Sequence, residues 1–162
     1  MPSIYLSPST QEFNEYANGL GTEEEWMNRL ADAMEPQLTA SGIRFTRNTP
    51  DMTAASSIQA SNAGSYDLHL ALHSNASGAG QEGRNRGILA FYYPGSANGQ
   101  RAAEFFVDGL KAIYPLPALV RTEPTTTLGE VRRTRAPAVL LELGFHDNPE
   151  DAQWIVTHID AM

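Results

Sequence analysis

The sequence predicts one α/β domain over residues 1–162, with a mostly parallel or mixed central sheet of about six strands and helices on both faces. Short apolar strands alternate with amphipathic helical segments, which is typical of this fold class. The run Tyr66–Asn75 (YDLHLALHSN) is an apolar run that carries two histidines and stops at small polar residues, as a largely buried central strand would. At 162 residues the chain is long enough to bury about two-thirds of its unfolded surface in one core.

Six strands are expected from apolar runs bounded by turn residues. They cover residues 4–6, 43–46, 66–73, 88–93, 119–122 and 138–143. The fifth lies in a proline- and threonine-rich segment and is expected at an edge of the sheet. The third carries its leucines on one face and His69 and His73 on the other, because successive strand side chains alternate. We expect His73 to end that strand, where open α/β sheets bind their ligands.

Helices are expected at residues 22–38, 56–62, 102–113 and 148–159. Thr22 and Glu25 match a capping box, so Thr22 is the expected N-cap of the first helix. Pro36 is expected to kink or shorten its last turn. Glu23 lies four residues before Met27 and therefore on the buried face. A first-turn acid that complements the helix dipole is the alternative explanation of Glu23.

Charge and composition exclude several classes of function. With 19 acidic and 11 basic residues the net charge is −8, which disfavours nucleic acid and anionic membranes as partners. No stretch approaches the roughly 20 apolar residues of a membrane span, and MPSIYLSPST lacks the features of a signal peptide. The chain has no cysteine, so zinc would need nitrogen and oxygen ligands. We expect a monomer.

Glu142 is the least ordinary residue of the sequence, because it is the single charge in the apolar strand AVLLEL. Burying a carboxylate is costly unless it is paired, protonated or close to a metal. A salt bridge to Arg132, Arg133 or Arg135 is one explanation. A catalytic or metal site is the other.

Glu142, His73 and Glu23 meet at one edge of the sheet if the strands of the first two are neighbours. One imidazole and two carboxylates, with water, suit a zinc ion that keeps an open position. His69 shares a face with His73 but lies about 13 Å further back along the strand, so the two cannot bind one ion. We interpret His69 as a hydrogen-bonded core residue.

Three motifs resemble those of the zinc-dependent N-acetylmuramoyl-L-alanine amidases of type 3. That family has a helical glutamate, a strand motif S-x-H-x-N and a late motif P-A-V-L-x-E-x-G-F-x-x-N. This chain has Glu23 followed by Ala31, LHSNA at Leu72–Ala76 and PAVLLELGFHDN at Pro137–Asn148. The late motif is the most specific. The resemblance covers nearly the whole chain and implies a three-layer, zinc-exopeptidase-like fold.

The chain departs from the family pattern after the first strand. There the family has a Gly-His-Gly-Gly turn whose histidine is the first zinc ligand, whereas this chain has Ser9-Thr10-Gln11-Glu12. In this respect it resembles a subgroup of clostridial-type wall hydrolases that begins SPS-x-Q. Gln11 or Glu12 is then the candidate oxygen ligand, and we assign Gln11, although amide oxygens bind zinc weakly.

The resemblance implies hydrolysis of the amide between N-acetylmuramic acid and the L-alanine of the peptidoglycan stem peptide. One zinc ion would be held by Glu23 and His73, with Glu142 taking a proton from water and passing it to the leaving amine. Arg132 or Arg133 is a candidate partner for a stem-peptide carboxylate. The expected location is the bacterial cell wall or the extracellular space.

Two alternatives remain. One is a zinc peptidase of carboxypeptidase type, which shares the sheet architecture and the ligand chemistry. The other is a non-catalytic peptidoglycan-binding domain whose metal site is degenerate because the first histidine is absent. Retention of Glu142 favours an enzyme, because a binding domain has no need of a buried carboxylate.

Overall fold

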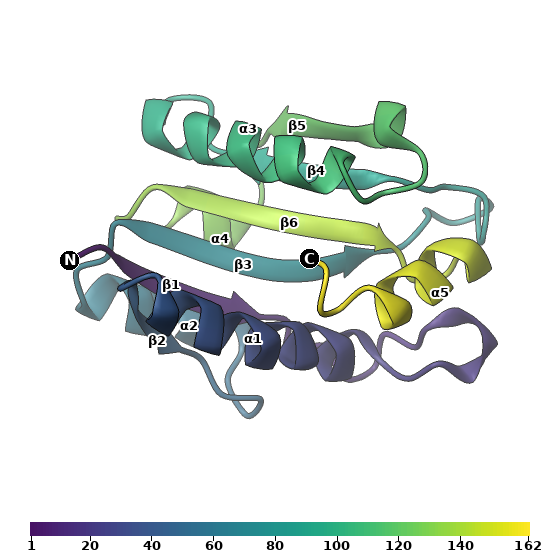
Figure 1. Ribbon diagram of the computed structural model, residues 1–162, viewed down its shortest axis with the longest axis horizontal. Helices are drawn as coiled ribbons and strands as arrows, with labels where there is room; N and C mark the ends of the chain where they lie inside the picture. Colours follow the sequence, from purple (N-terminus) through teal and green to yellow (C-terminus); the bar gives the residue numbers. More distant parts are fainter.

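The computed structural model describes residues 1–162 and contains one six-stranded sheet with the strand order β2-β1-β3-β6-β4-β5 (Figure 1). The strands are β1 (Ser3–Pro8), β2 (Arg44–Arg47), β3 (Leu68–Asn75), β4 (Ile88–Tyr92), β5 (Val120–Pro124) and β6 (Ala138–Phe145). β2, β1, β3 and β6 are parallel, β4 is antiparallel to β6, and β5 is parallel to β4. The prediction of a mixed sheet with the fifth strand at an edge is confirmed.

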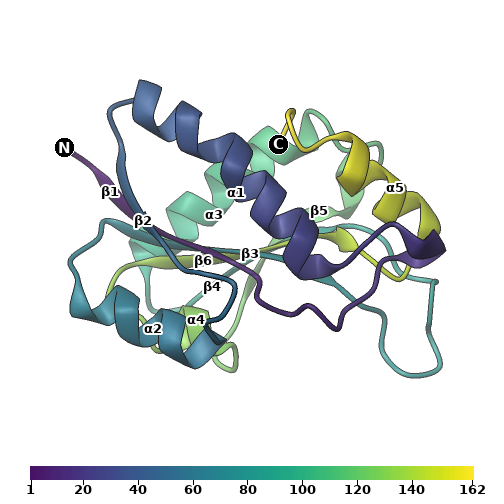
Figure 2. The ribbon, with the colours of Figure 1, turned by 90° about the horizontal axis from the view of Figure 1, so that it is seen from below.

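Five α-helices cover both faces of this sheet. They are α1 (Glu23–Ala40), α2 (Ala54–Ala63), α3 (Ala97–Lys111), α4 (Gly129–Arg132) and α5 (Pro149–Thr157), with 3₁₀ turns at Ala17–Gly19 and Pro117–Leu119. Figure 2 shows α1, α3 and α5 on one side and α2 and α4 on the other. The three-layer arrangement expected from the sequence is therefore present.

The two faces of the sheet differ in what they bury. The face towards α1, α3 and α5 contributes Leu6, Leu70 and Leu141 to a hydrophobic cluster of 21 buried residues, whereas the apolar cluster on the other face has only 3. Alternation along β1 and β3 turns polar side chains towards α2 and α4 instead. The buried polar residues of this second layer are Ser7, Ser57, Ser61, His69 and Glu130. One face thus forms the core, and the other holds a polar network.

Helix α1 begins as predicted and ends later. The Thr22 side chain accepts from the backbone N–H of Glu25 at 3.2 Å, which confirms it as the N-cap. The Glu25 carboxylate bonds Arg29 rather than closing a reciprocal capping box. The expectation that Pro36 shortens the helix is wrong, because the helix continues to Ala40. Pro36 has no N–H to donate to the carbonyl four residues before it. Because Pro36 is exposed, water can hydrogen-bond to that carbonyl instead.

Other boundaries also differ from the prediction by one to five residues, and the end of β3 and the start of α3 are examples with a clear cause. β3 continues two residues past His73 to Asn75, since a register shift between these two positions lets Asn75 pair with Phe145 of β6. α3 begins at Ala97 rather than 102, because the Ser96 side chain caps it by accepting from a backbone N–H in its first turn. Apolar periodicity does not detect a polar first turn of this kind.

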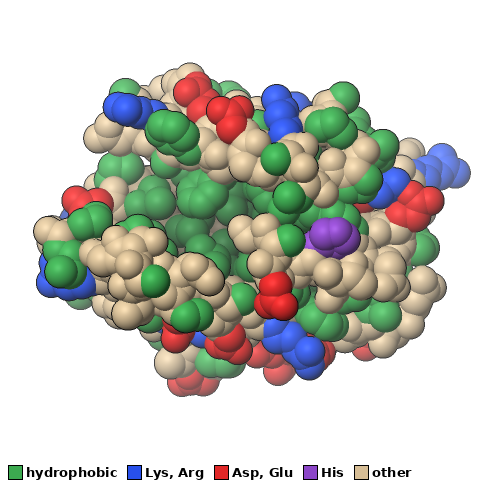
Figure 3. Space-filling model, in the orientation of Figure 1, with side chains coloured by type: hydrophobic (Ala, Val, Ile, Leu, Met, Phe, Trp, Pro, Cys, Tyr) green, Lys and Arg blue, Asp and Glu red, His purple; other side chains and the backbone are tan.

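An apolar hollow opens on the face that carries α1 and α3 (Figure 3). Its lining includes Leu30, Met34, Leu72, Phe105, Phe106 and Met162. None of the helices combines the length and apolar character that a membrane span requires.

Candidate active site

The predicted meeting of His73 and Glu142 occurs at the carboxyl ends of β3 and β6. The two strands are neighbours, and these two residues are direct partners in the register. Glu23, the first residue of α1, reaches the same edge with 1 % of its surface exposed. The sequence therefore located the three principal candidate residues correctly relative to one another.

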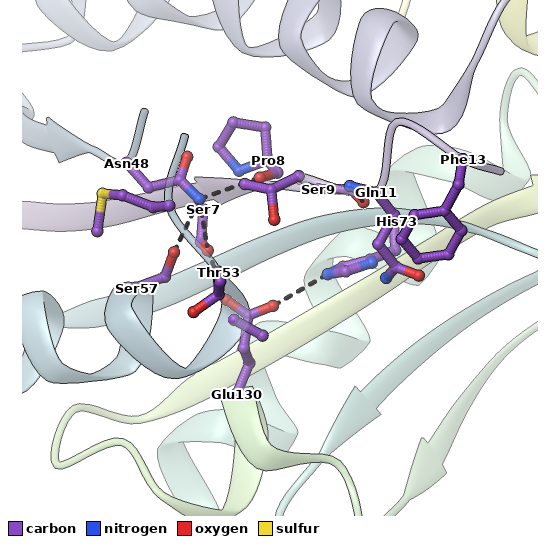
Figure 4. Close-up of a pocket in the computed structure, with 13 residues that line it drawn as sticks. Ser7, Pro8, Ser9, Gln11, Phe13, Asn48, Thr53, Ser57, His73 and Glu130 are labelled. Carbon is purple, nitrogen blue, oxygen red and sulfur yellow. Dashed lines mark hydrogen bonds and ion pairs between the residues drawn. The ribbon is translucent and has the colours of Figure 1, made fainter. Parts of the chain in front are cut away.

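His73 lies between two carboxylates. Its Nδ1 donates to Glu23 Oε1 at 2.9 Å, and its Nε2 donates to Glu130 Oε2 at 3.0 Å (Figure 4). Burial acts to lower the pKa of His73, but the hydrogen bonds and negative charges of Glu130 and Glu23 outweigh it and raise that pKa. Without a metal, the ring is an imidazolium held at both nitrogens.

Glu23 is surrounded by donors on its other side. Asn14 Nδ2 donates to Glu23 Oε2 at 2.6 Å and to Gln11 Oε1 at 3.0 Å, so one amide group links the two oxygens. Burial acts to raise the pKa of Glu23, but hydrogen bonds from His73, Asn14 and Ser9 leave it below its ordinary value. The Asn14 amide group thus connects the Gln11 amide oxygen to the Glu23–His73 pair.

Glu142 has a carboxylate oxygen, Oε2, that is buried and has no hydrogen-bond partner. Burial raises the pKa of Glu142 to about 7; the positive charge of His73 opposes this rise and the negative charge of Glu23 adds to it. The salt bridge proposed as an alternative is absent, because no ion pair joins Glu142 to an arginine. Arg132 and Arg133 are exposed at the end of α4 and remain candidates for substrate contact.

Glu130 is the site residue that sequence reasoning missed. It lies on α4 with 5 % of its surface exposed, and its Oε1 accepts from Ser7 Oγ and from His69 Nε2 at 3.1 Å. Burial acts to raise the pKa of Glu130, but the hydrogen bonds from His69 and His73 lower it strongly. A helix of four residues gives no periodic signal, so the sequence offered only an acid beside the apolar Val131.

His69 is a buried core histidine, as predicted. Its Nδ1 lies 3.0 Å from Ser61 Oγ, and its ring stacks on Tyr5 with the centroids 5.3 Å apart. His69 and His73 contact opposite oxygens of the Glu130 carboxylate. They therefore occupy two separate positions rather than one ligand site.

A polar cleft of about 280 Å³ opens beside His73 and Glu130 (Figure 4). Thr10, Gln11 and Phe13, from the loop after β1, line it opposite the start of α2. Phe13 is 75 % exposed, which leaves an aromatic side chain at the rim. The cleft gives solvent and substrate access to His73.

Glu23 and His73, two side chains of the types that bind zinc, lie in hydrogen-bond contact at this edge of the sheet. No group of three His, Cys, Asp or Glu side chains is arranged to hold a metal, so Glu23 and His73 would need a third ligand of another type. Gln11 Oε1 is the nearby oxygen that the structure offers. Carboxylate and imidazole groups are usual zinc ligands, and an amide oxygen with water would complete the set as a weaker donor. The unpartnered Glu142 oxygen belongs to the residue that pairs with His73 in the register of β3 and β6.

Residues 10–161 match the family model described as N-acetylmuramoyl-L-alanine amidase. The chain belongs to the N-acetylmuramoyl-L-alanine amidase family. The match covers the loop after β1 as well as the strands bearing His73 and Glu142, so the departure at Thr10 lies within the family's domain. No curated protein sequence matches this amidase-family chain.

Solved structures of amidases share the fold of this family member. AmiC2 of Nostoc punctiforme matches with a TM-score of 0.83 and 12 % identity over 99 % of this chain and 89 % of that one. The CwlD amidase from Clostridioides difficile, in complex with the GerS lipoprotein, matches with a TM-score of 0.85 and 13 % identity. The match covers 99 % of this chain and 92 % of that one. The catalytic domain of the CD27L endolysin, which targets Clostridia difficile, matches with a TM-score of 0.80 and 22 % identity. The match covers 99 % of this chain and 92 % of that one. At these identities the matches confirm the fold.

Proposed function

We propose that this amidase-family protein is a zinc-dependent peptidoglycan hydrolase that cleaves the amide between N-acetylmuramic acid and L-alanine. The observation that carries the proposal is Glu142, whose unpartnered carboxylate oxygen lies opposite His73 in the register of β3 and β6. A buried acid without a partner is destabilising, and such groups are characteristic of catalytic sites. The family match to N-acetylmuramoyl-L-alanine amidases supports the choice of substrate.

Glu23 and His73 would hold the zinc ion, with Gln11 as the third protein ligand. When bound, zinc supplies a Lewis acid that polarises the scissile carbonyl and makes water a better nucleophile at neutral pH. Glu130 keeps the His73 ring in place from its other side. The loss of the usual first histidine is then met by an amide oxygen, and we expect weaker zinc binding than a third imidazole would give.

Glu142 acts as the general base and then as the general acid. Burial raises the pKa of Glu142 to about 7 in the metal-free protein, and a carboxylate poised near neutral pH can take a proton from water and return it to the leaving amine of L-alanine. The exposed Arg132 or Arg133 would bind a carboxylate of the stem peptide, since a guanidinium group matches its planar geometry. The substrate implies action at the bacterial cell wall.

Digestion of purified peptidoglycan tests this proposal. We expect the zinc-loaded wild type to release stem peptides, and Glu142→Gln to lose activity by a factor of about 10² to 10⁴ while it keeps its zinc. Glu104→Gln, on the exposed side of α3, is the matched control and should retain full activity. An inert wild type that still sediments with cell walls would support the non-catalytic binding domain instead.

A further inference from the structure

We infer that Glu130 is a positioning residue for His73, fixing the ring so that Nδ1 is the nitrogen presented to the metal. This inference rests on the proposed zinc site and concerns a residue outside the family motifs. Glu130 does not contact the proposed ligand position. It acts through the opposite edge of the His73 ring, where its Oε2 lies 3.0 Å from Nε2.

Both nitrogens of the His73 ring face a carboxylate, so the choice between them depends on which carboxylate is free to turn to the ion. An ionised carboxylate only accepts hydrogen bonds, so a ring nitrogen that faces one must carry a proton. A protonated nitrogen cannot bind a metal, and Glu130, whose two oxygens are already occupied, keeps Nε2 protonated, whereas Glu23 is itself a proposed ligand and can release Nδ1. The Nδ1 of His73, 2.9 Å from Glu23 Oε1, is left to exchange its proton for an ion.

Glu130 can impose this orientation because it is itself held in place. Its second oxygen accepts from Ser7 Oγ on β1 and from His69 Nε2 on β3. His69 is fully buried, bonded to Ser61 on α2 and stacked on Tyr5. The carboxylate is therefore anchored from two strands and, through His69, from a helix.

The remaining metal donors converge on the other side of the ring. Gln11 Oε1 and Glu23 Oε2 accept from the same Asn14 amide, and Glu142 is the register partner of His73. On the Glu130 side, both carboxylate oxygens are already occupied by donors within a buried layer. The ion therefore belongs on the Nδ1 side, with Glu130 behind it.

This arrangement matters more here than in a site with three strong ligands. A carboxylate behind a ligating histidine fixes its orientation and raises its basicity, and removing such a partner typically costs 10- to 100-fold in metal affinity. Because Thr10 stands where the family has its first histidine, His73 is the imidazole that contacts the proposed ligand Glu23. Its correct presentation then decides whether the ion is held.

Titration with zinc alone tests the inference in wild type, Glu130→Leu and Glu130→Gln. We expect Glu130→Leu to weaken zinc binding by about 10- to 100-fold. Glu130→Gln should recover most of the affinity, because its amide oxygen can accept from His73 while its amide nitrogen donates to His69. In the zinc-loaded wild type, ¹⁵N chemical shifts should show a protonated Nε2 and a metal-bound Nδ1 on His73. If Glu130→Leu does not fold, the Gln variant and the wild-type ring spectrum still decide the question.

The possible outcomes separate this inference from the proposed function. Unchanged zinc affinity in Glu130→Leu, or zinc bound through Nε2, would overturn the role of Glu130 even if peptidoglycan is cleaved. Zinc binding through Nδ1 that depends on Glu130, in a protein that leaves peptidoglycan intact, would support the inference and contradict the function. A wild type that binds no zinc would contradict both.

Discussion

Glu142 carries a stability cost that its proposed catalytic role would explain. Its carboxylate is buried without a partner, and its pKa is raised to about 7. A raised pKa means that the folded state binds the proton more tightly than the unfolded chain does. The associated stability is fully present below the ordinary glutamate pKa and is lost as the pH rises through about 7.

Glu142→Gln should therefore stabilise the zinc-free protein at alkaline pH. A glutamine side chain stays neutral, so the variant lacks the loss of stability between about pH 4.5 and 7. Above that window we expect it to exceed the wild type by on the order of 3 kcal/mol, and to match it near pH 4. Urea unfolding in the presence of a chelator measures this difference. If the unfolding free energies of the two proteins change with pH in parallel, the ionised form of Glu142 does not destabilise the folded protein and the prediction is wrong.

Gln11 and Glu12 are adjacent oxygen-bearing residues that the structure separates. Gln11 lines the cleft and shares a donor with Glu23, whereas Glu12 is exposed. We expect Gln11→Ala to weaken zinc binding by about tenfold, which corresponds to about 1.4 kcal/mol. Glu12→Ala, the neighbouring control, should leave the dissociation constant unchanged in a zinc titration. The opposite pattern would make Glu12 the oxygen ligand.

At the scale of elements, Asp151 joins α5 to the ends of the strands next to the site. Its Oδ2 accepts from the backbone N–H groups of Gly87 and Phe145, both at 3.0 Å. Its Oδ1 accepts from Arg86 Nε at 2.9 Å and from Tyr114 Oη at 2.6 Å. This fully buried carboxylate ties the start of β4, the end of β6 and α5 together.

Asp151→Asn should be strongly destabilising. The asparagine has one oxygen that can accept hydrogen bonds, and its NH₂ group would face N–H or O–H donors that bond the second aspartate oxygen in the wild type. We expect a loss of about 3 kcal/mol of unfolding free energy. Glu150→Gln is the matched control, since Glu150 pairs with the same Arg86 from an exposed position and should cost less than about 1 kcal/mol. Urea denaturation of both variants checks the comparison, and similar losses would contradict the hub role of Asp151.

Most elements were predictable because their signals are local. The apolar runs identified all six strands, and the S/T-x-x-E pattern located the start of α1 at Thr22. The second polar layer was not predictable, because it depends on how α2 and α4 dock against the sheet. Glu130 acquires its role only when α4 places it between Ser7 and His73, residues that are far from it in sequence.

At the scale of the whole molecule, the site depends on parallel strands that end together. Three of its elements, β1, β3 and β6, are adjacent and parallel. Gln11 in the loop after β1, His73 on β3 and Glu142 on β6 therefore all lie at one edge of the sheet. Alternation along β3 predicted that His73 and His69 share a face, and the structure confirms it. The sequence could not show that one carboxylate contacts both rings, since that follows from the three-dimensional packing.

The chemistry of the ends released from peptidoglycan tests the central claim most directly. Hydrolysis of the N-acetylmuramoyl–L-alanine amide frees the α-amino group of L-alanine and the lactyl carboxylate of the sugar. We predict that amino-group labelling of a zinc-supplemented wild-type digest finds new L-alanine amino termini, and that the Glu142→Gln digest has none above background. New termini at other stem-peptide residues, with the alanine still attached to the glycan, would contradict the amidase assignment and favour a peptidase.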